Sequence, residues 1–229
     1  MFVTDNEEIY EKAKQVWSFG ENRTPVEDRD YHAYALGWMY RNNDLTAAFG
    51  RAQLTRLDEY ISIQRENAYV LKETLKDIDG YILPCEPEDY MHTYYNFTSR
   101  IDPAAFGWNG KPAVFRDAVL KAIQAEGVDA GIWQRYSLPE MTVFNARNAY
   151  GSGCPWSCPY SEGADKIEYN PQAFPEALKH CDTHFGMTMP LRAPNRTDVA
   201  EKTAQGIKKV FDNIDSLDLS SPRPLRAGI

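Results

Sequence analysis

Two histidines and two cysteines have spacings that could serve metal chemistry. His180 and His184, in HCDTH, place two imidazoles one helical turn apart, and this spacing can bind zinc. The sequence fixes no acidic or cysteine partner for them, so we expect exposed polar side chains near a helix end instead. Cys154 and Cys158, in GCPWSCP, are separated by three residues rather than the two of common zinc or redox motifs. We therefore interpret this stretch as a tight aromatic loop and predict no metal site.

Other signatures of catalysis are missing from the sequence. It contains no glycine-rich phosphate loop and no serine elbow, and no spacing pairs a nucleophile with a base. The residue patterns by themselves indicate an acidic α/β protein and do not specify a reaction.

Composition excludes some classes of partner. The 229 residues carry a net charge of −8, so there is no basic surplus to neutralise nucleic acid or an acidic membrane. Hydrophobic residues make up 43%, which is enough for a core, but no apolar run is long enough to span a bilayer. The start, MFVTDNEEIYEK, lacks the regions of a signal peptide. We therefore expect a cytoplasmic protein with reduced cysteines and neither nucleic-acid nor membrane partners.

The stretch 37–80 must organise the rest of the chain. Asn43 is placed to cap a helix, and Gly80 stands where that helix would end. No proline interrupts it, so we expect one helix of roughly 50 Å, at about 1.5 Å per residue, which could bridge two packed bodies. The apolar stripe on its buried face is Leu54, Leu57, Ile61, Ala68, Leu71, Leu75 and Ile78.

The remaining elements follow from local patterns. Asp5 or Asn6 can cap a first helix, and Asn195 can cap the last one. The element order after residue 81 predicts a small α/β or α+β sandwich. The expected strands are 1–4, 81–85, 92–101, 128–134 and 187–192; the expected helices are 7–19, 111–125, 170–184 and 198–214; and 20–30 and 136–160 are expected loops.

The organising stretch also carries a family resemblance. Its sequence GWMYRNNDLTAAFGRAQLTRLDEYISIQREN resembles the G-aromatic-N-aromatic-R-M-x-E/D-L-x-A-A-x-G-x-x-Q-L-x-R-L segment of DegT/DnrJ/EryC1/StrS aminotransferases. These are fold-type-I enzymes that use pyridoxal 5'-phosphate. MFVTDNEEIYEKAKQVWSFGE resembles the strand and helix that follow the family's lysine segment, and the 139–159 loop and PLRAPNRTDV resemble its C-terminal region. The resemblance covers nearly all of residues 1–219.

The resemblance implies an α/β fold that is the C-terminal part of a fold-type-I transferase. Residues 1–36 would be a remnant of the large cofactor-binding domain. Residues 37–80 would form a cofactor-phosphate loop and the long connecting helix. Residues 81–219 would be the small C-terminal α/β sandwich domain, and 220–229 a mobile tail.

The resemblance also implies site residues. Arg41, and with it Tyr40 and Met39, would lie at the cofactor phosphate of a neighbouring active site. Met39 stands where the family has an asparagine, and a thioether cannot donate a hydrogen bond. Candidate substrate walls are His92, Tyr94, Trp133 and Trp156; for the first three, core packing on an aromatic strand is the alternative.

The implied reaction moves an amino group from glutamate or glutamine to a keto-sugar nucleotide or a cyclitol. None of the lysines lies in the family's S-x-x-K context, so the Schiff-base lysine is absent and we expect the chain alone not to transaminate. It would act as a homodimer or as a heterodimer with a lysine-bearing aminotransferase chain. A truncated product, a split enzyme and a non-catalytic partner subunit all remain open, and the residues do not identify the keto substrate or the amino donor.

Overall fold

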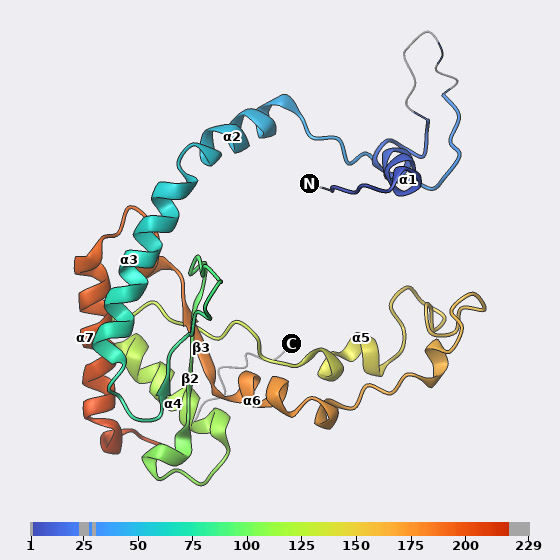
Figure 1. Ribbon diagram of the computed structural model, residues 1–229. Helices are drawn as coiled ribbons and strands as arrows, with labels where there is room; N and C mark the ends of the chain where they lie inside the picture. Colours follow the sequence, from blue (N-terminus) through green and yellow to red (C-terminus); the bar gives the residue numbers. More distant parts are fainter. Residues whose placement is uncertain (1, 23–27, 29–30, 220–229) are drawn as a thin grey trace. The chain divides into compact units, whose positions relative to one another are not determined.

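The computed structural model describes residues 2–22, 28 and 31–219 (Figure 1). The chain divides into two compact units, Met1–Asp58 and Glu59–Ile229. The predicted tail at 220–229 lies outside the described residues, as does most of the predicted loop at 20–30. Among the described residues, no helix is both long and apolar enough to cross a membrane.

The first unit begins with helix α1, Glu7–Trp17. The Asn6 side chain accepts the Ile9 N–H at 3.0 Å, which confirms Asn6 as the cap. The helix ends because Phe19 and Gly20 adopt positive φ angles of 58° and 81°. The strand predicted at the start is wrong for residues 2–4, which form no bridge or ladder with any described residue, and a strand needs a partner ladder.

The predicted single long helix is wrong, because it breaks into α2, Asp44–Leu54, and α3, Leu57–Leu75. At the break the Thr55 hydroxyl donates to the Ala52 carbonyl at 2.8 Å, and the Arg56 N–H bonds Gln53 at 3.0 Å. A side chain that hydrogen-bonds its own backbone competes with the helical ladder, so the turn tightens without proline or glycine. Asn43 caps α2 as predicted, accepting the Thr46 N–H at 2.9 Å.

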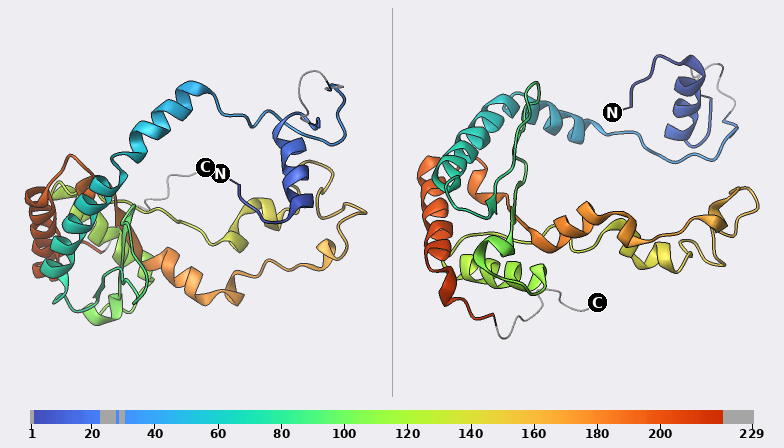
Figure 2. Two further views of the ribbon diagram at one scale, coloured as in Figure 1. Left: turned by 45° about the horizontal axis from the view of Figure 1, so that its top comes forward. Right: turned by 60° about the horizontal axis from the view of Figure 1, so that its bottom comes forward.

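The second unit is built on a three-stranded antiparallel sheet in the order β1-β2-β3. The strands are β1, Tyr81–Ile82; β2, Phe97–Ile101; and β3, His184–Met187. Tyr81 pairs with Ile101, and Phe97 pairs with Met187. Helices α4, Pro112–Ala125, α6, Pro175–Thr183, and α7, Thr197–Asp212, complete the unit with α3. Figures 1 and 2 show α3 and α7 next to each other beside the sheet.

The core of this unit joins the sheet to α3, α4 and α7. Buried apolar side chains from all of these elements form one cluster, so each element depends on the others for its stability. Its largest fully buried members are Phe97, Phe185, Leu71, Leu75, Ile101, Leu120, Ile123, Met187, Leu191 and Ile207.

Several predicted strands end early or shift. Residues 92–96 are not a strand, since Tyr94 has a φ of 52°. The strand predicted at 81–85 stops at Ile82. The strand predicted at 128–134 is reduced to one bridge, from Gly131 to Gly186. Of the strand predicted at 187–192, only Met187 is in a strand, as the last residue of β3. A 3-10 turn follows over Met189–Leu191, where Pro190 has no N–H to donate to a neighbouring strand.

Two helix predictions also change. The one predicted over 170–184 begins only at Pro175, after a separate 3-10 turn, and stops before His184, which starts β3. Asn195 does not cap α7: its side-chain amide donates to the Met189 carbonyl at 2.8 Å. Helix α4 is confirmed, and Gly127 ends it with a φ of 84°.

Residues 135–174, here called the arm, run out from the sheet and return to α6 (Figures 1 and 2). The arm holds the short helix α5, Thr142–Asn145, and 3-10 turns over Leu138–Glu140, Ala164–Lys166 and Pro171–Ala173. The predicted loop at 136–160 is therefore interrupted by one 3-10 turn and by α5. All four cysteines of the chain lie among the described residues, and none forms a disulfide.

Candidate functional site

The segment that contains Met39, Tyr40 and Arg41 lies against the end of α1. The Trp38 N–H donates to Val16 at 3.0 Å, the Tyr40 N–H donates to Trp17 at 3.1 Å, and the Phe19 N–H donates to Trp38 at 3.1 Å. This is an antiparallel bridge centred on Ser18 and Met39. Successive side chains of paired extended backbone alternate in direction. Met39 and Arg41 therefore share one side, and Tyr40 lies on the other.

Two glycines permit this arrangement. A Cβ on Gly20 would stand 1.8 Å from the Ala35 carbonyl oxygen, and a Cβ on Gly37 would stand 2.2 Å from the Gly20 nitrogen. The two backbone segments thus cross in contact, and only glycine fits at the crossing. This crossing sets the register of the Met39–Arg41 segment on α1, and sequence patterns gave no sign of it.

Arg41 is the basic group of this segment. Its guanidinium lies over the Phe19 ring, with Cζ at 5.6 Å from the ring centroid. Its Nε is buried and has no hydrogen-bond partner among the described residues. A buried donor without a partner is costly, because the desolvation of the N–H is not compensated. The geometry therefore leaves one N–H of the Arg41 guanidinium unsatisfied among the described residues.

Tyr40 faces a cavity of about 720 Å³ within the first unit. Glu11 holds Lys14 in this wall through an ion pair at 2.9 Å, and the hydrogen bond to Glu11 raises the pKa of Lys14. Met39 does not line the cavity, and its side chain is 61% exposed. The cavity is lined by Phe2, Tyr10, Ala13, Lys14, Trp17, Tyr40 and Asn42.

In the second unit, His92 and Tyr94 stack on each other with ring centroids 4.3 Å apart. The His92 Nδ1 accepts the Tyr94 N–H at 2.8 Å, so a neutral His92 ring carries its proton on Nε2. Tyr94 is only 4% exposed and stacks further on Phe97. The ring of Tyr94 is therefore part of the core, which is the alternative that the sequence left open for it.

An ion pair that the sequence analysis did not find holds the His92 backbone. Arg65 Nη1 lies 2.7 Å from both Glu86 Oε1 and the His92 carbonyl oxygen. The same Glu86 oxygen accepts the His92 N–H at 2.8 Å. The Arg65 hydrogen bond lowers the pKa of Glu86. Because the pair is separated by 21 residues in the chain, spacing could not reveal it.

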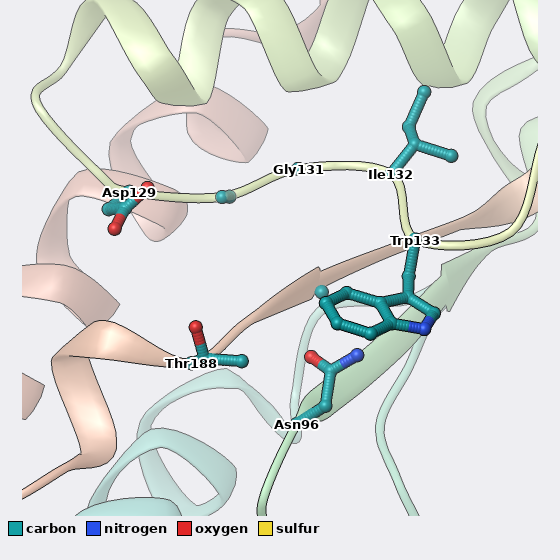
Figure 3. A pocket seen from close by; sticks show the side chains of 8 residues that line it. Asn96, Asp129, Gly131, Ile132, Trp133 and Thr188 are labelled. Atoms are coloured by element: carbon teal, nitrogen blue, oxygen red, sulfur yellow. The ribbon is translucent and has the colours of Figure 1, made fainter.

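Trp133 lies at a second cavity, of about 190 Å³, next to the Gly131–Gly186 bridge. The ring is 62% exposed, so it is not a core residue. Figure 3 shows the Trp133 indole and the Asn96 amide facing each other, whereas Asp129 lies at the other end of the segment 129–133 and Thr188 lines the cavity from β3's end. Asn96, Asp129 and Thr188 escaped the sequence analysis, because they come from three separate segments.

Trp156 lies in the arm, among aromatic side chains. Its indole N–H donates to the Tyr169 hydroxyl at 2.7 Å, and its ring meets Phe144 and Tyr169 edge-on. It is 9% exposed, so the arm gives this ring a small core of its own. Packing among aromatic side chains, which the sequence analysis offered as an alternative only for the other three candidates, therefore applies to Trp156 as well.

His180 and His184 stack face to face at 4.2 Å rather than pointing nitrogen lone pairs at a common point. His184 is fully buried, which corrects the expectation of two exposed side chains. Its Nδ1 lies 2.7 Å from the His180 carbonyl oxygen, and its Nε2 accepts the Gln134 N–H at 3.1 Å. Within the described part of the chain, no group of three or more His, Cys, Asp or Glu residues could hold a metal ion.

Comparison with known proteins matches this chain to one family of aminotransferases. Residues 1–180 match the model of the DegT/DnrJ/EryC1/StrS aminotransferase family. A Streptoalloteichus tenebrarius protein assigned as an L-glutamine:3-amino-2,3-dideoxy-scyllo-inosose aminotransferase is 30% identical over 129 residues, which cover 56% of this chain and 29% of that protein. A UDP-N-acetyl-3-dehydro-alpha-D-glucosamine 3-aminotransferase of Acidithiobacillus ferrooxidans is 26% identical over 176 residues, which cover 77% of this chain and 41% of that protein.

Solved structures share the fold. One of a Streptococcus pneumoniae protein assigned as a sugar aminotransferase, in its PLP-form, superposes with a TM-score of 0.67 at 11% identity and covers 92% of this chain and 45% of that one. Such likenesses confirm the predicted fold class, part of a fold-type-I transferase. The chain spans 29% to 45% of the length of these three relatives.

Proposed function

The chain belongs to the DegT/DnrJ/EryC1/StrS aminotransferase family, and on that basis we propose that it is the C-terminal portion of a pyridoxal 5'-phosphate-dependent transaminase. Its reaction moves an amino group from glutamate or glutamine to a keto-sugar nucleotide or a cyclitol. The relatives' names support both kinds of acceptor, since one names an inosose and the other a UDP-linked dehydro sugar.

The observation that carries the proposal is the unpaired, buried Nε of Arg41. It fits an anion such as the cofactor phosphate, because a guanidinium makes charge-assisted hydrogen bonds to phosphate oxygens. Met39 lies on the same side of the segment but cannot donate a hydrogen bond, so Arg41 carries this contact without it. Tyr40 lines the neighbouring cavity, on the side of the segment opposite to Met39 and Arg41.

The cofactor, when bound, supplies the carbonyl and the electron-accepting ring that carry the amino group. The residues here bind and orient; the lysine that takes part in proton transfer is supplied from outside this chain. His92 can donate from Nε2 to an oxygen of the acceptor, since its Nδ1 is already engaged. Trp133 offers an exposed ring face, whereas Tyr94 and Trp156 support the walls from buried positions.

The proposed organisation is a remnant of the large domain at 1–36, a phosphate loop and connector at 37–80, and the small domain at 81–219. The partner is a second copy or a lysine-bearing aminotransferase chain, in the cytoplasm. Exposed apolar side chains of the first unit support such a partner, because helices α1 and α2 bury none of their own residues. Leu36 and Leu45 are each 85% exposed.

A second candidate is a non-catalytic partner subunit of a complete or split aminotransferase. Met39 favours it, because a subunit that only stabilises its partner can lose a phosphate contact. The two candidates differ in whether Arg41 matters for cofactor retention.

The test is to purify the chain with a lysine-bearing aminotransferase chain and to measure cofactor affinity from the pyridoxal phosphate absorbance. Arg41→Gln should weaken retention about 10- to 100-fold, because a hydrogen bond to a charged group is lost. Met39→Asn should tighten it by adding a donor. Arg51→Gln, an exposed arginine in the last turn of α2, is the matched control and should change nothing.

If the Arg41→Gln and Met39→Asn variants keep the native cofactor affinity, the phosphate assignment fails. If the partner chain transfers amines at the same rate with the Arg41→Gln variant but loses stability when this chain is removed, the non-catalytic subunit is the correct function.

A further inference from the structure

The cavity beside Trp133 contains polar side chains whose hydrogen-bonding capacity the protein does not use. Within the described part of the chain, neither Asn96, Asp129 nor Thr188 makes a side-chain hydrogen bond or ion pair. Asn96 and Thr188 are only partly exposed, so water does not reach them freely. Polar groups that converge on a cavity without protein partners are the usual mark of ligand recognition.

Glycine makes room for this cavity. Gly131 and Gly186 exchange two backbone hydrogen bonds, at 2.9 and 2.8 Å, and form one of its walls. A Cβ on Gly186 would stand 2.5 Å from Asn96 Oδ1, so the amide lies directly against the bare backbone of β3. The position of Asn96 therefore depends on the absence of a side chain at residue 186.

The chemistry of the wall specifies the ligand class. The Asp129 carboxylate accepts hydrogen bonds only, whereas Asn96 and Thr188 can both donate and accept, so the ligand must offer donors as well as acceptors. The exposed face of Trp133 suits the C–H face of a saturated ring. Among the described residues, no lysine, arginine or histidine lines the cavity, and Asp129 repels anions.

The size of the cavity limits what it can hold. About 190 Å³ corresponds to on the order of six water molecules. That is below the roughly 300–1,000 Å³ of sites for drug-sized ligands, so the cavity suits a single ring rather than a whole enclosed nucleotide.

We infer that this cavity binds an uncharged, polyhydroxylated ring. Identifying that ring as part of the amine acceptor rests on the proposed function, but the binding itself does not. Asp129 would act as the specificity residue, since it favours hydroxyl donors and rejects phosphorylated forms of the same ring.

The experiment titrates the full chain, labelled with ¹⁵N, with myo-inositol and follows the indole N–H signal of Trp133, assigned by its loss in Trp133→Phe. We expect saturable shifts with a Kd of about 1 to 10 mM, as befits a small ligand. Asp129→Asn should weaken binding about tenfold, because a hydrogen bond to a charged group is lost. Gly186→Ala should abolish it by displacing Asn96.

Asp182→Asn is the matched control, a carboxylate outside the cavity, and should bind like the native chain. Glucose and glucose 6-phosphate form a second pair: the native chain should prefer glucose, and Asp129→Asn should reduce that preference. Should Gly186→Ala fail to fold, Asp129→Asn still decides the matter, since Asp129 is exposed and its replacement leaves the core intact.

Three results would overturn the inference: no saturable shift of the Trp133 signal, unchanged binding in Asp129→Asn, or equal affinity for glucose and glucose 6-phosphate. The assay needs neither cofactor nor a second chain. A failure of amine transfer in the reconstituted complex therefore leaves ring binding standing, and a failure of ring binding leaves the cofactor assignment untouched.

Discussion

Replacing His184 with glutamine should remove a specific part of the pH dependence of folding. His184 is fully buried between the His180 ring and the segment that carries Gln134. Burial lowers its pKa to about 4, and the charges of His180 and Arg116 act in the same direction. A protonated ring could no longer accept the Gln134 N–H on Nε2.

The sign of the effect follows from proton counting. Between a native pKa of about 4 and an unfolded pKa of about 6.5, the unfolded chain binds more protons at this residue, so stability falls as the pH is lowered through that window. From about pH 7.5 to about pH 5 the loss is about 2 kcal/mol. With an m-value of about 2 kcal/mol/M, this loss lowers the urea concentration at the unfolding midpoint by about 1 M.

The assay is urea unfolding followed by circular dichroism at both pH values, for the native chain and for His184→Gln. The variant should lose about 2 kcal/mol less on acidification than the native chain, whatever its stability at neutral pH. His180→Gln keeps the buried ring and should retain most of the dependence. Equal losses in the native chain and in His184→Gln would show that another group is titrating and would refute the argument.

Two further substitutions test the core of the second unit. Arg116→Met should lower the free energy of unfolding by about 3–5 kcal/mol, because it leaves the carbonyls of Cys181 and His184 and the Asp117 carboxylate without their donor. The control is Lys208→Met, which removes an exposed ion pair and should lower the free energy of unfolding far less. Similar losses in the two variants would count against a structural role for Arg116. Leu71→Ala should cost about 2–5 kcal/mol in urea unfolding because Leu71 is fully buried, whereas Leu45→Ala, at an 85% exposed site, should cost little in the isolated chain. Equal costs would mean that α2 is packed in solution.

Sequence patterns identified helices well where capping and apolar spacing agree. Asn6 and Asn43 cap helices as predicted, and α4 occupies its predicted span, because these signals are local. The break at Thr55 was not predictable from periodicity, since the apolar spacing continues through it and a side-chain hydrogen bond decides the outcome.

Strands were harder to place, because their ends depend on partners distant in sequence. Aromatic residues from His92 onward favour a strand, yet the ladder begins only at Phe97, opposite Met187. His184 fits a helical pattern with His180, but pairing with β2 draws it into β3.

The candidate site could be predicted only in part. The family resemblance singled out Arg41 through a matching segment, and His92 and Trp133 were named as candidate substrate walls. It could not reveal that the Arg41 Nε is buried without a partner among the described residues, or that Asn96 and Asp129 line the same cavity as Trp133, because these are properties of the folded chain.

The contact between Gly186 and Asn96 also constrains how this protein can diverge. A Cβ at residue 186 would stand 2.5 Å from the amide oxygen of Asn96, so a change at 186 requires the Asn96 side chain to move away or to be replaced by a shorter one. The two positions are therefore epistatic, and the order of substitution matters. Among relatives, a residue larger than glycine at 186 should occur together with a shorter residue at 96.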